Sequence, residues 1–228
     1  LRDISFTAKK GQTVAFIGST GSGKSTLLNL IPRFYDVSEG SVQVDGVDVR
    51  HMTQKDLRDK LGYVPQKAVL FSGTIHSNIS YGCPDASREQ VERAAVIAQA
   101  DSFIMEKPEA YDSPISQGGS NVSGGQKQRL SIARAIARQP EILLFDDSFS
   151  ALDFKTDSAL RKALKEAVKD TTTLIVAQRI STIIHADLIL VLDEGRIVGQ
   201  GTHQELLKNC DVYRQIAMSQ LSEEELAG

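Results

Sequence analysis

Short apolar runs separated by turns divide the first part of the chain into predicted strands and helices. Residues 1–17 predict two short strands around a turn. Apolar residues alternating around Asp45-Gly46 predict a hairpin, because Asp-Gly favours a tight two-residue turn. Residues 54–60 have the pattern of a short polar helix, and residues 61–64 that of another strand. The pattern therefore predicts an alternation of strands and helices.

The pattern changes between residues 77 and 138, where helical periodicity replaces the short strands. Apolar residues of segment 91–98 fall on one helical face, and residues 124–138 predict a second helix. We interpret this region as a helical lobe inserted into one domain. The predicted parts are the domain 1–228, its α/β core 1–76 and 139–228, and the lobe 77–138.

Strand patterns return after the lobe. Residues 142–146 form a short continuous apolar run, which is typical of a central parallel strand buried on both faces. The expected elements that follow are an amphipathic helix over 155–169, strands over 172–177, 188–192 and 196–198, and a helical tail over 204–221. The predicted fold is α/β, with a mainly parallel sheet, a small antiparallel β part and the inserted helical lobe.

Composition narrows the class of protein. The 228 residues, 41% of them hydrophobic, are enough for one sizeable core. A net charge of −3 gives no broad basic surface, so we expect no nucleic-acid partner. Cys83 and Cys210 are the only cysteines, which fits a reducing compartment better than a disulfide framework. The chain starts at Leu1 within a strand-like pattern, so we expect a domain cut from a longer protein.

The most informative stretch follows the apolar run 13–17 and fits G-x-x-x-x-G-K-[ST], the phosphate-binding loop. Its glycines allow a tight turn with N–H groups pointing inward, and the helix that follows aims its positive end at the same place. Lys24 can reach the β- and γ-phosphates, and Ser25 offers a hydroxyl to Mg²⁺. A plain Gly/Ser turn seldom carries Lys-Ser after a buried strand. The motif predicts a P-loop NTPase (RecA-like) core that binds a nucleoside triphosphate through Gly18, Ser19, Thr20, Gly21, Ser22, Gly23, Lys24, Ser25 and Thr26.

Two further features belong with this loop. The apolar run 142–146 ends in Asp146, and a carboxylate at the end of a strand beside the phosphate-loop strand can hold the Mg²⁺ shell through water. Ser123, Gly124, Gly125 and Gln126 open a helix, with Ser123 placed to cap it. The two glycines leave N–H groups bare, which suits an anion. The chain thus carries two helix N-termini that favour phosphate.

These motifs, in this order, resemble the ATP-binding domain of ABC transporters, over essentially the whole chain. Residues 18–26 match Walker A, 142–146 match Walker B, 150–153 match the D-loop, and 123–126 match the signature, with Val122 where Leu is usual. Gln66 matches the glutamine that in the family contacts Mg²⁺ and faces the membrane domain. The resemblance implies ATP and Mg²⁺ as cofactors, with Ser25, Gln66 and Asp146 at the metal. It also implies a second such domain as partner, each ATP lying between one Walker A and the opposite signature.

The finer resemblance is to exporters. Residues 71–79 and 201–207 are similar to exporter segments after the Q-loop and near the C-terminus. This implies transmembrane domains as further partners and a place at the cytoplasmic face of the cell membrane. The family's adenine-stacking aromatic is expected outside this chain, since no aromatic residue precedes Phe6.

Two positions depart from the family at the hydrolytic step. Asp147 stands where the catalytic Glu is usual, one methylene shorter, and Gln178 replaces the switch-loop histidine. We therefore expect the catalytic positions Asp147, Gln178 and Lys24 to form a site that binds ATP but hydrolyses it poorly. That combination resembles one half of a heterodimeric exporter, whose partner supplies Glu and His.

Two alternative functions stay open, and the sequence argues against a third. A nucleotide-binding regulatory module without turnover would explain Asp147 and Gln178, and an active homodimer would need Asp147 to suffice as the base. A DNA-repair or chromosome-organising ATPase would need a long coiled coil, and the chain has no such heptad segment.

Overall fold

The computed structural model describes residues 1–222. The predicted domain end at residue 228 therefore lies outside the described residues. Six strands form one sheet in the order β10-β9-β1-β8-β7-β4, parallel except for β10. Their bounds are β1 Thr13–Gly18, β4 Leu61–Val64, β7 Ile142–Asp146, β8 Thr172–Val176, β9 Leu188–Asp193 and β10 Arg196–Gly201. The predicted mainly parallel α/β sheet is confirmed.

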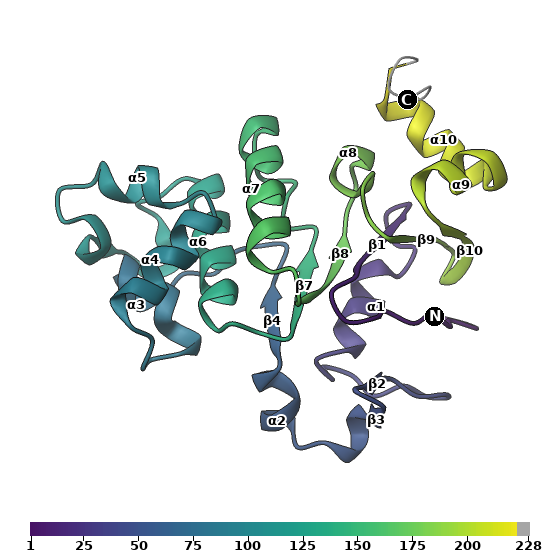
Figure 1. Ribbon diagram of the computed structural model, residues 1–228, viewed down its shortest axis with the longest axis horizontal. Helices are drawn as coiled ribbons and strands as arrows, with labels where there is room; N and C mark the ends of the chain where they lie inside the picture. Colours follow the sequence, from purple (N-terminus) through teal and green to yellow (C-terminus); the bar gives the residue numbers. More distant parts are fainter. Residues whose placement is uncertain (223–228) are drawn as a thin grey trace.

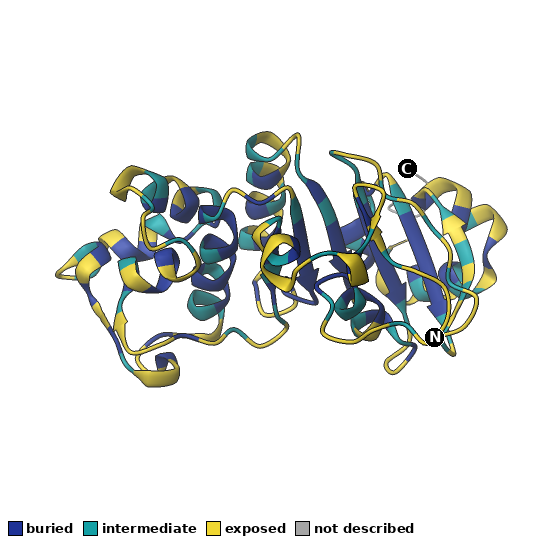
Figure 2. Ribbon diagram, turned by 90° about the horizontal axis from the view of Figure 1, so that it is seen from below, coloured by how far each residue is buried: buried dark blue, intermediate teal, exposed yellow. Residues whose placement is uncertain are grey.

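Alternating side chains divide the core between the two faces of this sheet. On β1, Val14 and Phe16 join one apolar cluster, whereas Ala15 and Ile17 join the other. The first face is covered by α1 (Lys24–Leu30), by α2 (Gln54–Asp59) and by the hairpin β2 (Gln43–Val44) and β3 (Val47–Asp48). Figure 2 shows the strands as the most continuously buried part of the chain. The predicted hairpin around Asp45-Gly46 and the short helix after it are both present.

Helices cover the other face and extend beyond the sheet to one side, as Figure 1 shows. The predicted lobe, residues 77–138, includes the end of α3 (Ile75–Ile79) and all of α4 (Arg88–Ile97), α5 (Asp101–Met105) and α6 (Gly124–Ala137). The remaining helices are α7 (Phe154–Ala167), α8 (Ile180–Ile183), α9 (His203–Asn209) and α10 (Asp211–Gln220), and short 3₁₀ turns lie at Val49–His51, Ser80–Gly82, Ala110–Asp112 and Gln117–Gly119. Buried Gln128 of α6 donates to the carbonyl of Pro65 (3.1 Å), which ties the lobe to the end of β4.

Three sequence expectations were wrong. Residues 1–8 form no strand: Ile4, Phe6 and Ala8 pack on the core without joining the sheet. The region 77–138 is not free of strands, because β6 (Pro114–Ile115) pairs with β5 (Gly73–Thr74). The strand ending in Asp146 does not lie beside the phosphate-loop strand, because β8 separates β7 from β1.

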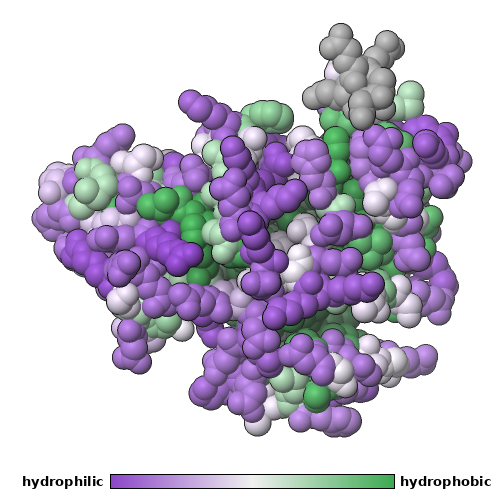
Figure 3. All heavy atoms as spheres, viewed as in Figure 1, coloured by the Kyte–Doolittle hydropathy of each residue, from purple (hydrophilic) through white to green (hydrophobic). Residues whose placement is uncertain are grey.

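Figure 3 shows a face covered mostly by hydrophilic side chains. Within residues 1–222, no helix has the length and apolar character needed to cross a membrane.

Candidate nucleotide site

The loop of residues 18–23 joins β1 to α1, and glycine is required at two of its positions. A β-carbon added to Gly18 would lie 2.0 Å from the carbonyl oxygen of Leu192, which is far inside van der Waals contact. Gly23 begins α1 with φ 100°, in the left-handed region that glycine adopts without steric cost. The chain therefore turns sharply and close to β9, with the start of α1 directed at the loop.

Lys24 is nearly buried and points back into the loop. Its ammonium donates to the carbonyls of Gly18 (2.8 Å) and Ser19 (2.7 Å) and to the hydroxyl of Ser22 (3.3 Å). Burial lowers the pKa of Lys24, although the nearby carboxylates of Asp147 and Asp146 act in the opposite direction. A cation is thus held at the centre of a loop whose geometry suits phosphate.

Two of the three predicted metal residues, Ser25 and Asp146, meet here, whereas Gln66 bonds to Asp147. Ser25 Oγ, in the first turn of α1, donates to Asp146 Oδ1 at the end of β7 (2.6 Å). No group of three or more His, Cys, Asp or Glu side chains that could hold a metal occurs among the described residues. A hydroxyl and one carboxylate nevertheless fit Mg²⁺, which commonly takes one or two protein ligands, waters and substrate phosphates.

Asp147, Gln66 and Gln178 converge although they are far apart in the sequence. Asp147 Oδ2 accepts from Gln66 Nε2 (3.0 Å) and from Gln178 Nε2 (2.6 Å), the latter just after β8. The Asp147 side chain is only 6% exposed, and its backbone has φ 47°. Burial raises the pKa of Asp147, and the hydrogen bonds from Gln66, Ser150 and Gln178 only partly offset this. Residues with positive φ other than glycine often lie at functional sites.

The signature residues lie elsewhere, at the start of α6 in the lobe (Figure 1). Ser123 Oγ accepts from the Gln126 N–H (3.2 Å), and Gln126 Oε1 accepts from the Ser123 N–H (3.0 Å), which is a complete capping box. Ser123 and Gly124 are exposed. A β-carbon at Gly125 would meet the Ala151 carbonyl at 3.5 Å, so this helix start adjoins the D-loop. Within residues 1–222, no hydrogen bond joins the signature to the phosphate loop.

Gln220, the last residue of α10, is not among the site residues that the sequence predicts. Its side chain contacts the backbone of Gln178 and Ile180, forty-two and forty residues earlier. A lone glutamine near the end of an amphipathic helix carries no local pattern that distinguishes it from a solvated residue. Only the folded chain places it beside Gln178.

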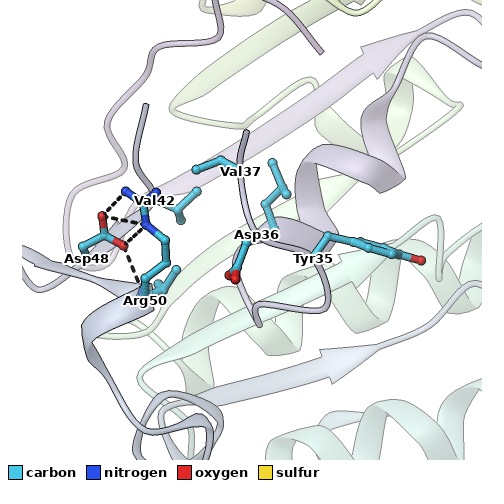
Figure 4. Close-up of a pocket in the computed structure, with 8 residues that line it drawn as sticks. Tyr35, Asp36, Val37, Val42, Asp48 and Arg50 are labelled. Carbon is cyan, nitrogen blue, oxygen red and sulfur yellow. Dashed lines mark hydrogen bonds and ion pairs between the residues drawn. The ribbon is translucent and has the colours of Figure 1, made fainter. Parts of the chain in front are cut away.

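A narrow hollow beside the β2–β3 hairpin is not part of this site (Figure 4). Tyr35, Asp36, Val42 and Arg50 line it, and Asp48 holds the Arg50 guanidinium (2.7 Å). It is too narrow to admit a water molecule. We assign no function to it.

A glycine-rich loop with a central lysine and a strand-end carboxylate on a parallel sheet defines a P-loop protein that binds nucleoside triphosphates. More specifically, the chain belongs to the ABC transporter family, which matches it over residues 1–150. The fold is that of the ATP-binding domain of this family, and ATP is its nucleotide.

The relatives are longer proteins. Over 216 residues the chain is 48% identical to putative multidrug export ATP-binding/permease proteins of Staphylococcus aureus strains NCTC 8325 / PS 47 and COL, covering 95% of this chain and 37% of each relative. It is 44% identical to a bacterial Atm1-family ABC exporter solved with ATP bound, with a TM-score of 0.93 over 96% of this chain and 39% of that one. The chain thus spans less than two fifths of the length of these relatives.

Proposed function

We propose that the chain is the ATP-binding domain of an exporter and that its own Walker site is the hydrolysis-poor half of a heterodimer. The exporter part is supported by the names of the relatives and by their similarity over 95% of the chain. The asymmetric part is supported by one observation. The Asp147 side chain is short, and within residues 1–222 its carboxylate accepts hydrogen bonds from two glutamine amides, Gln66 and Gln178, and from no histidine.

Binding follows from the loop geometry. In the proposed complex, Lys24 and the N–H groups at the start of α1 hold the phosphates, and Ser25 and Asp146 hold Mg²⁺. Gln66 would add its side-chain oxygen to the metal shell, although here its amide nitrogen contacts Asp147. The metal would neutralise charge that develops on the transferred phosphoryl group.

Poor hydrolysis follows from the side chains around Asp147. A general base must lie within about 2.6–3.2 Å of the water that it activates. Gln178 donates its amide to Asp147 and carries no charge toward the γ-phosphate. We therefore assign most turnover to the partner's site, which this chain would complete with Ser123, Gly124, Gly125 and Gln126.

Among the described residues, Ser123 of the signature is exposed and its side chain bonds only to Gln126 of the same helix, which supports a second domain as the partner of the signature. We propose a heterodimer of ATP-binding domains, with residues 77–138 acting as the lobe that carries the signature. Transmembrane domains would dock near Gln66 and residues 71–79. There the exposed rings of Phe71 and Tyr81 stack at 4.4 Å. This arrangement places the chain at the cytoplasmic face of the membrane.

The test compares three single variants in the assembled, full-length transporter. Ser123→Ala should abolish most ATP turnover, whereas Asp147→Asn should change it little. Ser87→Ala is the matched control, because Ser87 also caps a helix, α4, with a hydroxyl that accepts from Gln90 N–H (3.2 Å). Both serine variants lose a cap worth about 1 kcal/mol, so only a functional role separates them.

Two outcomes would contradict the proposal. Loss of turnover in Asp147→Asn would identify this site as the active one and favour the homodimer. Absence of turnover in every assembly, with ATP still bound, would favour the regulatory module.

A further inference from the structure

Gln220, the last residue of α10, forms two hydrogen bonds with the backbone of the segment that follows β8. Gln220 Oε1 accepts from the backbone N–H of Ile180 (2.8 Å), and Gln220 Nε2 donates to the backbone carbonyl of Gln178 (2.8 Å). One side-chain amide thus pairs with a carbonyl and an N–H two residues apart, as a neighbouring strand would. Figure 1 shows α10 next to α8.

The contact supplies a hydrogen-bond acceptor to the Ile180 N–H, which no side chain of the preceding residue caps. Ile180 is the first residue of α8, and the N–H groups of a first helical turn have no partner within the helix. Arg179, the residue at the N-cap position, makes no side-chain cap. Gln220 supplies the missing acceptor from another helix, which makes it a cap provided at long range.

The segment that Gln220 contacts, residues 178–180, includes Gln178. The Gln178 side chain reaches Asp147 (2.6 Å), and the Arg179 guanidinium donates to the carbonyls of Ser150 (3.3 Å) and Leu152 (3.5 Å). Three consecutive residues therefore link the carboxylate, the D-loop and the C-terminal helix. Gln220 bonds to the backbone on both sides of Arg179, on the segment from which the Gln178 side chain reaches Asp147.

We propose that Gln220 is a positioning residue for Gln178, and that the end of α10 thereby controls how the Walker site is arranged. A solvent-open pocket of about 290 Å³ borders the contact, lined by Phe154, Arg179, Ser181, Gln220 and Leu221. Where the inference concerns turnover, it rests on the proposed function, whereas its geometric part does not.

The first experiment measures hydrogen exchange at the Ile180 amide in the full-length protein. Gln220→Leu removes both hydrogen bonds, and we expect exchange to become about tenfold faster, since such bonds are individually modest. Gln220→Glu keeps an acceptor for the Ile180 N–H but has no donor for the Gln178 carbonyl, so it should retain most of the protection. Gln215→Leu is the control, because Gln215 lies exposed on the same helix and its side chain forms no hydrogen bond within residues 1–222.

The second experiment measures ATP turnover in an Asp147→Glu background, where the proposed function gives this site a measurable rate. Gln220→Leu should lower that rate about tenfold, and it should have no further effect once Gln178→Ala is present, because residues that act through one contact are not additive. Additive losses, or equal exchange in Gln220→Leu and Gln215→Leu, would overturn the inference. If Asp147→Glu adds no turnover, the proposed function fails, and the exchange data decide the inference alone.

Discussion

Asp147→Glu tests whether side-chain length limits this site. The extra methylene extends the carboxylate by about 1.5 Å, the length of one carbon–carbon bond. A displacement of about 1 Å at a reacting group can cost roughly a hundredfold in rate, or ~2.7 kcal/mol. If Asp147 falls short by this distance, its replacement by Glu should raise turnover at this site about a hundredfold. Adding Gln178→His should raise it further, because a histidine can carry charge toward the γ-phosphate.

The same change should destabilise the fold. Asp147 has φ 47°, in the region where Asp and Asn are several-fold enriched over other residues, which corresponds to about 1 kcal/mol. For a domain of this size, 1 kcal/mol lowers Tm by roughly 2–4 °C. Asp147→Glu should therefore combine faster turnover with a slightly lower Tm.

Asp45→Glu is the matched control. Asp45 has φ 52° in the exposed turn between β2 and β3, and the longer acid keeps the charge that pairs with Lys60 (3.0 Å). It should reproduce the fall in Tm and leave turnover unchanged. Steady-state phosphate release and thermal unfolding supply both readouts. Unchanged turnover in Asp147→Glu, with the expected Tm, would refute the argument from length. Brisk turnover in the unaltered protein would remove the need for an asymmetric partner.

Three other changes probe the same site. Lys24→Met should lower ATP affinity by about tenfold or more, because a hydrogen bond to a charged group contributes roughly 1.5–3 kcal/mol. Since burial lowers the pKa of Lys24, thermal stability should hold or rise, which calorimetry and equilibrium binding can check. For Asp147→Asn the pKa gives the sign: the folded-state pKa of Asp147 is raised, so the carboxyl contributes stability in acid that is lost as pH rises through that pKa. The variant's unfolding free energy relative to wild type, from urea titrations, should therefore increase from acid to neutral pH. Gly18→Ala should destabilise by about 1–3 kcal/mol or prevent folding, measured by the same titrations, because its β-carbon would meet the Leu192 carbonyl.

The sequence patterns predicted which side chains are buried better than they predicted which segments pair as strands. Ile4, Phe6 and Ala8 alternate as in a strand and do pack on the core. Among the described residues, however, segment 1–8 forms one backbone hydrogen bond to the rest of the chain, from the Arg2 N–H to the Gly195 carbonyl. Periodicity shows which side chains face the interior and cannot show whether the backbone has a neighbour. β6 has only two residues, too few for any alternation to be visible.

The site was predictable where one motif contains both the geometry and the chemistry. Residues 18–26 are such a case, because glycines, lysine and helix start are contiguous. The Gln66 bond to Asp147 joins residues eighty-one positions apart, and its existence depends on β4 and β7 being neighbours. Strand order is set by long-range pairing, which no local pattern encodes. The same reason accounts for the position of β8 between β1 and β7.

The position of β8 between β1 and β7 means that backbone hydrogen bonds fix one distance within the site. With β8 between them, the ends of β1 and β7 are separated by two strand spacings, roughly 9.5 Å. The hydrogen bonds between the strands hold this distance whatever side chains the strands carry. The phosphate loop and Asp146 therefore keep their separation when residues of the surrounding core are substituted. Substitutions at Asp147 and Gln178 can then alter reactivity without altering the frame, which allows two copies of one architecture to diverge in activity.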